Sequence, residues 1–280
     1  MTPLVSLLIP AYNHQAYVQQ TLDAIIHDDY PRKEIVIIDD GSVDDTDAVI
    51  RDWIRKHEAH ITVKYRSRPN KGLTKTLNEL LSLAEGEYLV AIASDDYLLP
   101  GGIRKRVDYL RAHPEKYAVF ADCIVVDAQS RTVSQSALFD YRHADRSRLS
   151  SDAGIRREFL TNFAMPGPVL MVRRDFYTQF GGYDDEMYIE DYDLYLRFAA
   201  HDAIGFLDEK VSAYRIHDTN MSTVSAENYL RLLTDSRRTL LNHRGDFEGI
   251  EKLLLWQSVL KFSLRIAYHR LRRRFTPYSG

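Results

Sequence analysis

Hydrophobic residues follow two different spacings along the first half of the chain. Short apolar runs rich in β-branched residues predict strands at residues 5–9, 34–38, 61–65, 88–93 and 117–126. The segments between them place apolar residues three and four apart, which predicts helices at residues 16–27, 44–57, 73–84 and 102–112. This alternation predicts an α/β fold with a doubly wound, mainly parallel sheet and helices on both faces.

The pattern changes after residue 126. Residues 140–152 are polar and arginine-rich without apolar periodicity, so we expect a mobile surface loop there. The remaining elements are predicted as strands at 169–173 and 211–216 and helices at 174–180, 189–200 and 251–274, the last within a region that is helical from 226 onward. We therefore expect a main domain over residues 1–222 and a C-terminal helical extension over 223–280.

Composition narrows the class of protein. The 280 residues are 45% hydrophobic and 28% charged, which is ordinary globular composition, and the net charge of -3 provides no basic field for nucleic acid. Cys123 is the single cysteine, so no internal disulfide forms, which fits a reducing compartment. Because no apolar run has the length of a membrane span and the first residues lack a basic signal start, we expect a soluble or peripheral cytoplasmic protein.

Polar side chains follow the predicted strands. Open α/β sheets bind ligands beyond the carboxyl ends of their strands, so residues at these ends come together. They are Tyr12 and Asn13, Asp39 and Asp40, Asn70 and Lys71, and Ser94, Asp95 and Asp96. The sequence predicts one polar, acid-rich cleft.

Two acidic pairs in this set have distinct interpretations. Asp95 and Asp96 would repel each other unless a divalent cation with oxygen ligands lies between them, although an acid here also suits a turn or helix cap. Asp39 and Asp40 can accept from the ring N–H of a uracil or thymine, or from ribose hydroxyls; a turn is the alternative. A receiver-domain phosphoacceptor would also place acids here, but such a domain is about half this length.

Two later segments carry further candidates. Glu190, Asp191 and Asp193 lie at the start of a predicted helix, where they either stabilise the helix dipole or accept a proton from a substrate hydroxyl. Arg215 and His217 share one face of a predicted strand and offer a guanidinium for phosphate and an imidazole for a metal, although a lone histidine is more often structural.

Several enzyme classes lack their motifs in this chain. It contains no P-loop, no G-x-G-x-x-G, no H-E-x-x-H and no G-x-S-x-G. Readings as an ATPase, a dehydrogenase, a zinc protease of that type or a serine hydrolase therefore have no residues to support them.

Six ordered segments together resemble family 2 glycosyltransferases with the GT-A fold. They span residues 4–222 and read VSLLIPAYN, IVIIDDGSVDDT, NKGLTKTLNELLSLAEGEYLVAIASDDYLLP, GGYDDEM, IEDYDLYLR and YRIHDTNMS. The resemblance implies transfer of a sugar from a nucleoside-diphosphate donor, with UDP or dTDP favoured, to an acceptor hydroxyl with inversion. It further implies a nucleotide-binding half at about residues 1–100 and an acceptor-binding half at about 101–222.

The same resemblance assigns roles on the donor side. Ala11, Tyr12 and Asn13 would line the nucleoside pocket, with Asp39 and Asp40 on base and ribose. The usual metal motif is Asp-x-Asp with a further acid, and here Ala93 replaces its first acid. Asp95 would hold Mg²⁺ or Mn²⁺ with its neighbour Asp96, and His217 would add a metal or phosphate contact. Arg215 would assist the leaving diphosphate.

On the acceptor side the resemblance assigns Asp191 as general base. Glu190 would support it, and Gly181, Gly182 and Tyr183 would form the acceptor loop. The acceptor would be a glycan or a lipid-linked glycan in the synthesis of cell-surface polysaccharide or glycolipid.

Two competing functions remain at this point. A sugar-phosphate nucleotidyltransferase shares the sheet and the metal chemistry, but it should carry a glycine- and arginine-rich loop where this chain has Pro10-Ala11-Tyr12-Asn13. A non-catalytic nucleotide-sugar binding module is suggested only by Ala93.

The C-terminal stretch 251–274 is amphipathic. Leu253, Trp256, Leu260 and Leu264 recur at helical spacing, and the residues from Lys261 to Arg274 include six bases and no acid. Such a helix either lies on an anionic membrane, at the inner face of the cytoplasmic membrane, or packs on the catalytic domain or on a second subunit in a homodimer.

Overall fold

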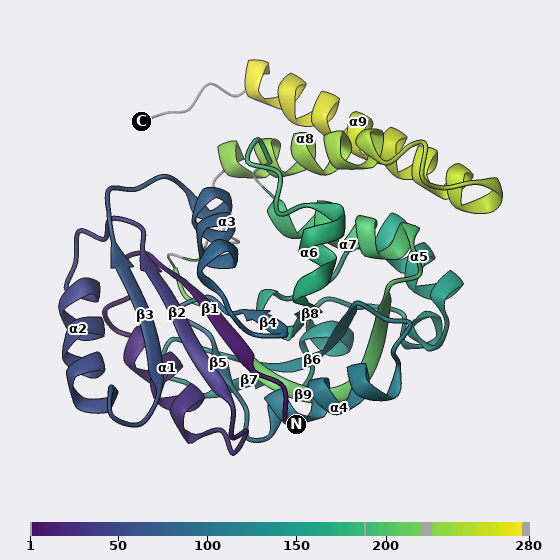
Figure 1. The fold of residues 1–280 in the computed structure, drawn as a ribbon. Helices are drawn as coiled ribbons and strands as arrows, with labels where there is room; N and C mark the ends of the chain where they lie inside the picture. Colours follow the sequence, from purple (N-terminus) through teal and green to yellow (C-terminus); the bar gives the residue numbers. More distant parts are fainter. Residues whose placement is uncertain (1, 188, 219, 221–225, 276–280) are drawn as a thin grey trace. The chain divides into compact units, whose positions relative to one another are not determined.

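The computed structural model describes residues 2–187, 189–218, 220 and 226–275 (Figure 1). Within this part of the chain the side chains of 226, 227 and 273–275 are left undescribed. Two compact units form. Unit 1 comprises Met1–Ala144, Ala164–Tyr183 and Ala203–Ile216; unit 2 comprises Asp145–Phe163, Asp184–Asp202 and His217–Gly280. The units therefore interleave along the sequence, and the predicted domain boundary at residue 222 lies outside the described residues.

Unit 1 is built on one sheet of nine strands in the described residues. They are β1 (Val5–Ala11), β2 (Lys33–Asp39), β3 (Thr62–Ser67), β4 (Tyr88–Ala91), β5 (Tyr97–Leu98), β6 (Ala118–Val126), β7 (Thr132–Ser134), β8 (Met171–Arg173) and β9 (Ile204–Arg215). Their order is β3-β2-β1-β4-β8-β6-β9-β5, with β7 beside β6.

The sheet is mainly parallel, as predicted, and three short antiparallel strands make it mixed. Strands β3, β2, β1 and β4 run parallel, as do β6 and β9. Strand β8 lies antiparallel between β4 and β6, and β5 and β7 are antiparallel to their partners. These three antiparallel strands are two or three residues long, too short to show a period of two in the sequence.

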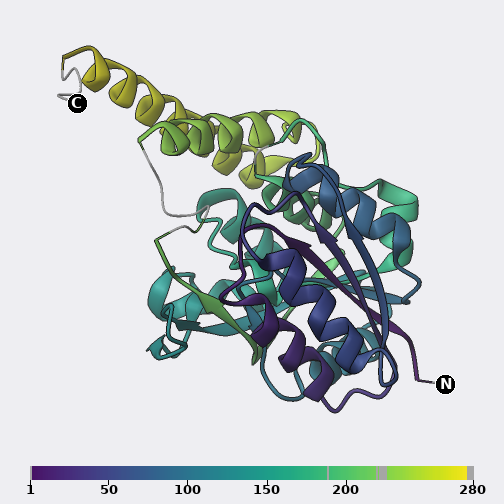
Figure 2. The ribbon, with the colours of Figure 1, turned by 90° about the vertical axis from the view of Figure 1, so that its left-hand side faces the viewer.

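Helices cover both faces of this sheet, as predicted. They are α1 (Val18–His27), α2 (Thr46–His57), α3 (Leu73–Leu83), α4 (Gly102–Ala112) and α6 (Arg174–Phe180). Successive strand residues point to opposite faces. Leu7 and Ile35 join the core cluster with residues of α1, α2 and α4, whereas Leu8, next in sequence, is buried outside that cluster. α3 packs on β1 and β2, and α1 and α2 lie side by side (Figure 2).

Unit 2 is helical in the residues described. It contains α5 (Asp152–Thr161), α7 (Glu190–Ala200), α8 (Ala226–Asn242) and α9 (Gly249–Phe275). α5 packs against α7 and α9, and α8 packs against α9. The Tyr192 hydroxyl donates to the carbonyl of Phe159 at 3.0 Å, and the Ser258 hydroxyl donates to that of Leu160 at 2.6 Å. These bonds tie both α7 and α9 to the end of α5.

The predicted surface loop at 140–152 is wrong. A helical turn covers Ala137–Tyr141, a 3₁₀ turn covers Arg146–Ser150, and α5 begins at Asp152. The segment folds despite its polarity because Leu149 is buried and Arg148 pairs with the buried Glu158 at 3.2 Å. An ion pair to a buried carboxylate leaves no apolar periodicity in the sequence.

The predicted strand at 211–216 is only the end of β9, which begins seven residues earlier at Ile204. The exposed residues 208–210 interrupt its apolar pattern. Among the described helices, none combines the length and apolar character that crossing a bilayer requires.

Candidate functional site

The loops beyond three adjacent strands meet at one edge of unit 1. Strands β2, β1 and β4 are parallel neighbours, and Ala11 at the end of β1 pairs with Asp39 at the end of β2. Parallel neighbours place their carboxyl ends at the same edge, where open α/β sheets bind ligands. This edge gathers the residues predicted for the cleft: Tyr12, Asn13, Asp39, Asp40, Ser94, Asp95 and Asp96, with Asn70 and Lys71 beyond β3.

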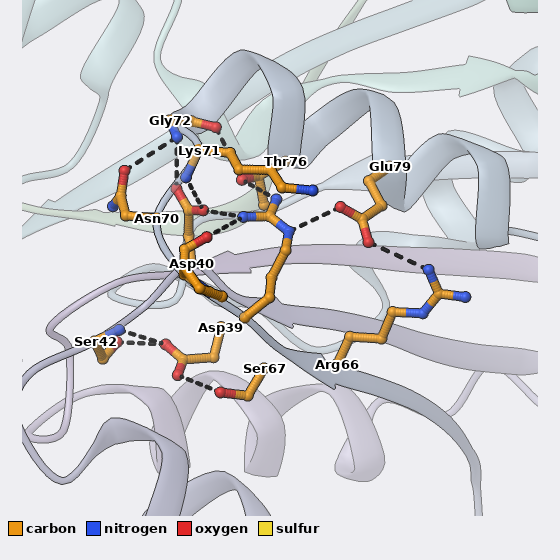
Figure 3. A network of polar contacts seen from close by, with 12 residues as sticks. Asp39, Asp40, Ser42, Arg66, Ser67, Asn70, Lys71, Gly72, Thr76 and Glu79 are labelled. Carbon is orange, nitrogen blue, oxygen red and sulfur yellow. Dashed lines mark hydrogen bonds and ion pairs between the residues drawn. The ribbon is translucent and has the colours of Figure 1, made fainter.

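Asp39 is held by hydroxyl groups (Figure 3). One carboxylate oxygen accepts from the backbone N–H of Ser42 at 3.2 Å and from the Ser42 hydroxyl, and the other accepts from the Ser67 hydroxyl at 3.2 Å. The residue is only 2% exposed. Its orientation is therefore set by the protein before any ligand arrives.

Asp40 joins the end of β2 to the start of α3. Its carboxylate accepts from the backbone N–H of Lys71 at 2.8 Å and of Gly72 at 3.0 Å, and it forms an ion pair with Arg68 (Figure 3). The Asn70 side chain also accepts from the N–H of Gly72, at 3.1 Å. One oxygen accepts from Arg68 and Lys71 and the other from Gly72, so the carboxylate is firmly fixed.

Arg68 is a residue of this site that the sequence reasoning missed. Beyond its pair with Asp40, its guanidinium donates to Glu79 at 2.8 Å and to the Thr76 hydroxyl at 2.9 Å, both on α3. Its side chain is 12% exposed. In the sequence it follows the edge strand β3 in an arginine-rich run that looks like a solvated surface, so no signal distinguished it.

Gly41 allows the two loops to approach each other. Its φ of +77° lies in the left-handed region, and a Cβ there would lie 2.6 Å from the backbone nitrogen of Asn70. Any side chain at this position would push the loop after β2 away from the loop after β3.

The loop after β1 is fixed through its backbone. The carbonyl of Ala11 accepts from the N–H of Asp40 at 2.8 Å, and the N–H of Asn13 donates to the Ser42 hydroxyl at 2.9 Å. The Asn13 side chain accepts from the N–H of Val43 at 2.8 Å, and the residue has a φ of +54°. Tyr12, between them, is 46% exposed, so its ring is the surface that this loop offers to a ligand.

Asp95 lies beside His14, a second residue that the sequence reasoning missed. The two side chains approach to 3.7 Å between Nε2 and a carboxylate oxygen. The other ring nitrogen of His14 is 2.8 Å from the Ser94 hydroxyl, which orients the ring. A carboxylate and an oriented imidazole are suitable ligands for a divalent cation, so unit 1 contains a candidate His/Asp site. His14 follows the predicted Tyr12-Asn13 loop directly, which is the signal that could have found it.

Asp96 faces the interior. Its carboxylate accepts from the backbone N–H of Arg215 at 2.8 Å and is 3% exposed. Burial, followed by the charge of Asp95, raises the pKa of Asp96 well above its usual value. The contact fixes β9 to the loop after β4, and the role of Asp96 as a metal ligand stays a prediction.

Arg215 is almost fully buried, with 1% exposed. Its guanidinium donates to the carbonyls of Asp95 at 2.8 Å and Asp127 at 3.0 Å and to the Gln20 side chain at 2.7 Å. It also lies 4.8 Å from the centre of the Tyr17 ring. These contacts make it a residue that positions the Asp95 loop, and its predicted contact with phosphate stays a prediction.

The Gly181-Gly182-Tyr183 segment is docked on α3. The Asn78 side chain donates to the carbonyl of Tyr183 and accepts from its N–H, both at 2.9 Å. A Cβ on Gly182 would lie 2.4 Å from the Asn78 side-chain oxygen. Gly182 therefore permits this docking, and the acceptor role of the segment stays a prediction.

Unit 2 contains the acids at the start of α7. Burial, followed by the charge of Asp191, raises the pKa of Glu190 well above its usual value. Asp193, in contrast, pairs with Arg197 at 3.0 Å and with His243 at 2.9 Å. Burial opposes ionisation of Asp193, but these two partners outweigh it and lower its pKa. Asp193 is thus a structural link from α7 to the segment after α8.

His217 is joined to the end of β9 through Ile216. The N–H of Ile216 donates to the carbonyl of Val126 at 2.8 Å, which fixes the last residue of unit 1. The backbone N–H of His217 donates to the Asn220 side chain. Its role as a metal ligand stays a prediction.

A sheet of this kind, with acidic loops beyond adjacent parallel strands, is an open α/β architecture that binds ligands at this edge. A family model described as glycosyl transferase family 2 matches residues 6–181. The chain belongs to this family, and the resemblance seen in the sequence is confirmed.

Curated relatives agree with this assignment. An uncharacterized glycosyltransferase of Rickettsia typhi is 25% identical over 233 residues, which cover 81% of this chain and 70% of that protein. A chondroitin synthase of Escherichia coli is 28% identical over 149 residues, 53% of this chain and 21% of the synthase.

Solved structures share the fold. S. aureus TarS in complex with UDP-GlcNAc superposes with a TM-score of 0.68 at 22% identity, covering 94% of this chain and 72% of that one. The mannosyltransferase PcManGT of Pyrobaculum calidifontis, in complex with GDP-Man and Mn²⁺, has a TM-score of 0.71 at 18% identity, covering 100% and 76%. The expected α/β fold of GT-A type is confirmed.

Proposed function

We propose that this protein is an inverting glycosyltransferase that moves a sugar from a UDP- or dTDP-sugar to an acceptor hydroxyl. The observation that carries the proposal is the pair Asp39 and Asp40, buried and fixed at the end of β2 by Ser42, Ser67 and Arg68. Two structures with the same fold hold nucleotide sugars, UDP-GlcNAc in TarS and GDP-Man in PcManGT.

The donor nucleotide is recognised by groups that are already in place. Each carboxylate oxygen has two lone pairs, so Asp39 retains accepting capacity beside its bond from Ser67. The ring N–H of a uracil or thymine and the ribose hydroxyls are donors of the right type. The exposed ring of Tyr12 offers a face on which a base can stack. Asn70 and the ammonium of Lys71 lie on the same edge and suit ribose and phosphate.

A divalent cation binds at the candidate His/Asp site. His14 and Asp95 of unit 1 can both ligate a metal ion, and His217 is the further ligand that the family resemblance implies. An imidazole beside a carboxylate favours Mn²⁺ over Mg²⁺, which prefers oxygen ligands. His14 thus replaces the ligand that is lost with the acid absent at Ala93. When bound, the cation stabilises the charge that develops on the leaving diphosphate.

Asp191 acts as the general base. It removes the proton of the acceptor hydroxyl, whose oxygen attacks the anomeric carbon as the bond to the diphosphate breaks on the opposite face. The raised pKa of Glu190 supports this assignment, because a protonated Glu190 adds no negative charge beside Asp191. Gly181, Gly182 and Tyr183 contribute to the acceptor side.

The acceptor is a glycan or a lipid-linked glycan, and the product belongs to cell-surface polysaccharide or glycolipid. A relative of this chain is a chondroitin synthase, which fits polymer synthesis. Synthesis at the cytoplasmic face of a membrane is consistent with the basic helix α9.

Donor binding is the direct test of this function. The protein is heated with UDP-, dTDP-, GDP- and CMP-sugars, with Mn²⁺, with Mg²⁺ and with EDTA. A donor at 100 times its Kd stabilises the fold by about 2.7 kcal/mol, which is a clear shift in melting temperature. We expect UDP- or dTDP-sugars with Mn²⁺ to give the largest shift; no shift with any nucleotide sugar would contradict the proposal.

Asp95→Asn tests the cation. We expect it to abolish metal-dependent donor binding and to lower transfer about 10²-fold or more, because a carboxylate ligand is lost. Asp108→Asn, an exposed change on α4, is the matched control. Full activity in excess EDTA would contradict the metal requirement.

The competing functions give different products in the same assay. A nucleotidyltransferase would consume a nucleoside triphosphate and a sugar phosphate and release pyrophosphate. A binding module would show the thermal shift without hydrolysis or transfer of the donor.

A further inference from the structure

Helix α9 has two apolar faces. One face is buried in unit 2 and includes Leu255, Val259 and Ile266, each less than 9% exposed. The Ser263 hydroxyl on this helix accepts from Arg237 of α8 at 2.8 Å. Packing on α5 and α8 therefore accounts for one side of the helix and no more.

The opposite side carries what we call the outer stripe. It consists of Leu253 (60% exposed), Trp256 (45%), Leu260 (60%), Leu264 (63%), Tyr268 (60%) and Leu271 (53%). These residues are three or four apart, so they form one line about 27 Å long on the helix surface. With Ile250, they make up seven of the eleven large apolar residues exposed in the described part of the chain. Contiguous exposed apolar surface of this kind marks a binding face.

Exposed cations border the outer stripe on both sides. At 100° per residue, Lys261, Arg265 and Arg272 lie on one side of it, and Lys252 and Arg270 lie on the other. The helix contains one acid, Glu251, which is paired with Arg156 at 2.7 Å. The surface around the stripe is thus cationic, most densely from Lys261 onward.

This charge pattern decides whether a second copy of the chain or a membrane surface binds the outer stripe. In a pair of α9 helices from two copies of the chain, the flanking positions would set Lys and Arg against Lys and Arg, and like charges there oppose association. An anionic bilayer surface complements the same pattern, because its headgroups attract the cations while its acyl boundary accepts the leucines.

We propose that the outer stripe of α9 lies in the interface of an anionic membrane. The helix lies along the surface, with Leu260 and Leu264 toward the acyl chains. Trp256 and Tyr268 have amphipathic rings, which favour the headgroup level. The flanking lysines and arginines extend their apolar stems along the stripe and their charges to the phosphates. This surface is independent of the transferase chemistry.

Co-sedimentation with vesicles tests the proposal on the full chain. The vesicles are phosphatidylcholine alone, or phosphatidylcholine mixed with phosphatidylglycerol, at low and at high salt. We expect binding only to the mixed vesicles, weakened by salt, because surface electrostatics are screened. Leu260→Ser with Leu264→Ser should lower binding at least tenfold, since about two buried side chains are lost from the interface.

Charge variants distinguish the effect of the cations beside the outer stripe from that of the overall charge of the protein. Lys261→Gln with Arg265→Gln should weaken vesicle binding about fivefold per charge removed. Arg55→Gln with Lys56→Gln removes the same charge from exposed positions of α2 and is the matched control, expected to leave binding unchanged. Circular dichroism and thermal unfolding verify that each variant is folded.

Three results would overturn the proposal. One is no binding to the mixed vesicles at low salt. Another is equal loss in the α2 control, which would indicate non-specific attraction. The third is a dimer in analytical ultracentrifugation that the Leu260→Ser, Leu264→Ser variant dissociates while vesicle binding is unaffected, which would make the stripe a subunit interface.

Discussion

The carboxylates at the end of β2 and those at the start of α7 are held in opposite ways. Asp40 is surrounded by donors: two backbone N–H groups and the guanidinium of Arg68. Glu190 instead loses hydration and has the like charge of Asp191 as a neighbour, and its pKa rises. The first arrangement fixes a charge in place, whereas the second keeps a proton on one member of a pair. A fixed charge suits recognition of a ligand, and a pair of carboxyl groups with one proton suits proton transfer.

The largest expected effect is on proton transfer at the start of α7. Asp191→Asn should lower kcat about 10²- to 10⁴-fold, because a general base is lost. The donor Kd should stay near its wild-type value, since the base acts on the acceptor. Steady-state transfer kinetics and donor titration measure the two. Unchanged kcat, or loss of donor binding alone, would contradict the assignment.

The next largest effect is on recognition of the donor at the end of β2. Asp40→Asn leaves the guanidinium of Arg68 without its carboxylate partner in the loop after β2, so we expect the loop after β3 to shift. Donor KM should rise about tenfold or more, and the free energy of unfolding should fall by about 1–3 kcal/mol. Glu79→Gln is the matched control, because it removes the partner of Arg68 on the side of α3. A similar stability loss with little change in donor KM is expected there; equal effects on KM would refute the role of Asp40.

Glu190→Gln sharpens the comparison through pH. Because the folded pKa of Glu190 is raised, the folded state binds the extra proton, and stability falls as pH rises from the usual glutamate pKa toward the raised value. Glutamine mimics the protonated form, so the variant should lack this part of the decline while kcat at neutral pH stays close to wild type. Urea unfolding across pH measures it, and an identical pH profile in both proteins would contradict the shift.

The smallest effect concerns the ion pair between Asp193 and His243. Burial would lower the pKa of His243, but Asp193 and Asp246 outweigh it and raise the pKa. The stability that the protein gains from protonated His243 is therefore fully present below the ordinary histidine pKa of 6.5. It is lost as pH rises through the raised pKa of the folded protein. The pKa of Asp193 is lowered in the folded protein, so the stability that its charge provides is present above the ordinary pKa of 3.8. It is lost as pH falls through the lowered pKa.

His243→Asn should therefore cost most between these limits, about 1–2 kcal/mol in the free energy of unfolding, and less at alkaline pH. Transfer activity should be nearly unaffected, because Asp193 is structural. A cost that is independent of pH would mean that the pair is not ionised in the folded protein.

The sequence revealed the residues whose position follows from strand order. Asp39 and Asp95 could be placed because the first ends an apolar strand and the second follows one, and parallel neighbours bring such ends together. Arg68 and His14 could not be placed in this way. Arg68 is largely shielded from solvent only because α3 supplies Thr76 and Glu79 from the other side of the loop.

The features of the fold that the sequence did not predict have a similar origin. The segment before α5 looked like a loop because Arg148 is paired with the buried Glu158 of α5, a contact that leaves no local pattern. Strand β8 is antiparallel within a largely parallel sheet, and three residues contain no pattern that indicates direction. Contacts between distant segments determine both features, and local periodicity does not record them.

The close approach at Gly41 limits how this site can be altered by directed evolution. A Cβ at residue 41 would collide with the backbone of Asn70, so a mutational library that includes this position yields mainly displaced loops. The two neighbours suited to variation are Tyr12 and Val43, which are 46% and 87% exposed. Val43 is held through its backbone N–H, so its side chain can be exchanged without loss of that bond. Engineering of a new base preference should therefore vary Tyr12 and Val43 and leave Gly41 unchanged.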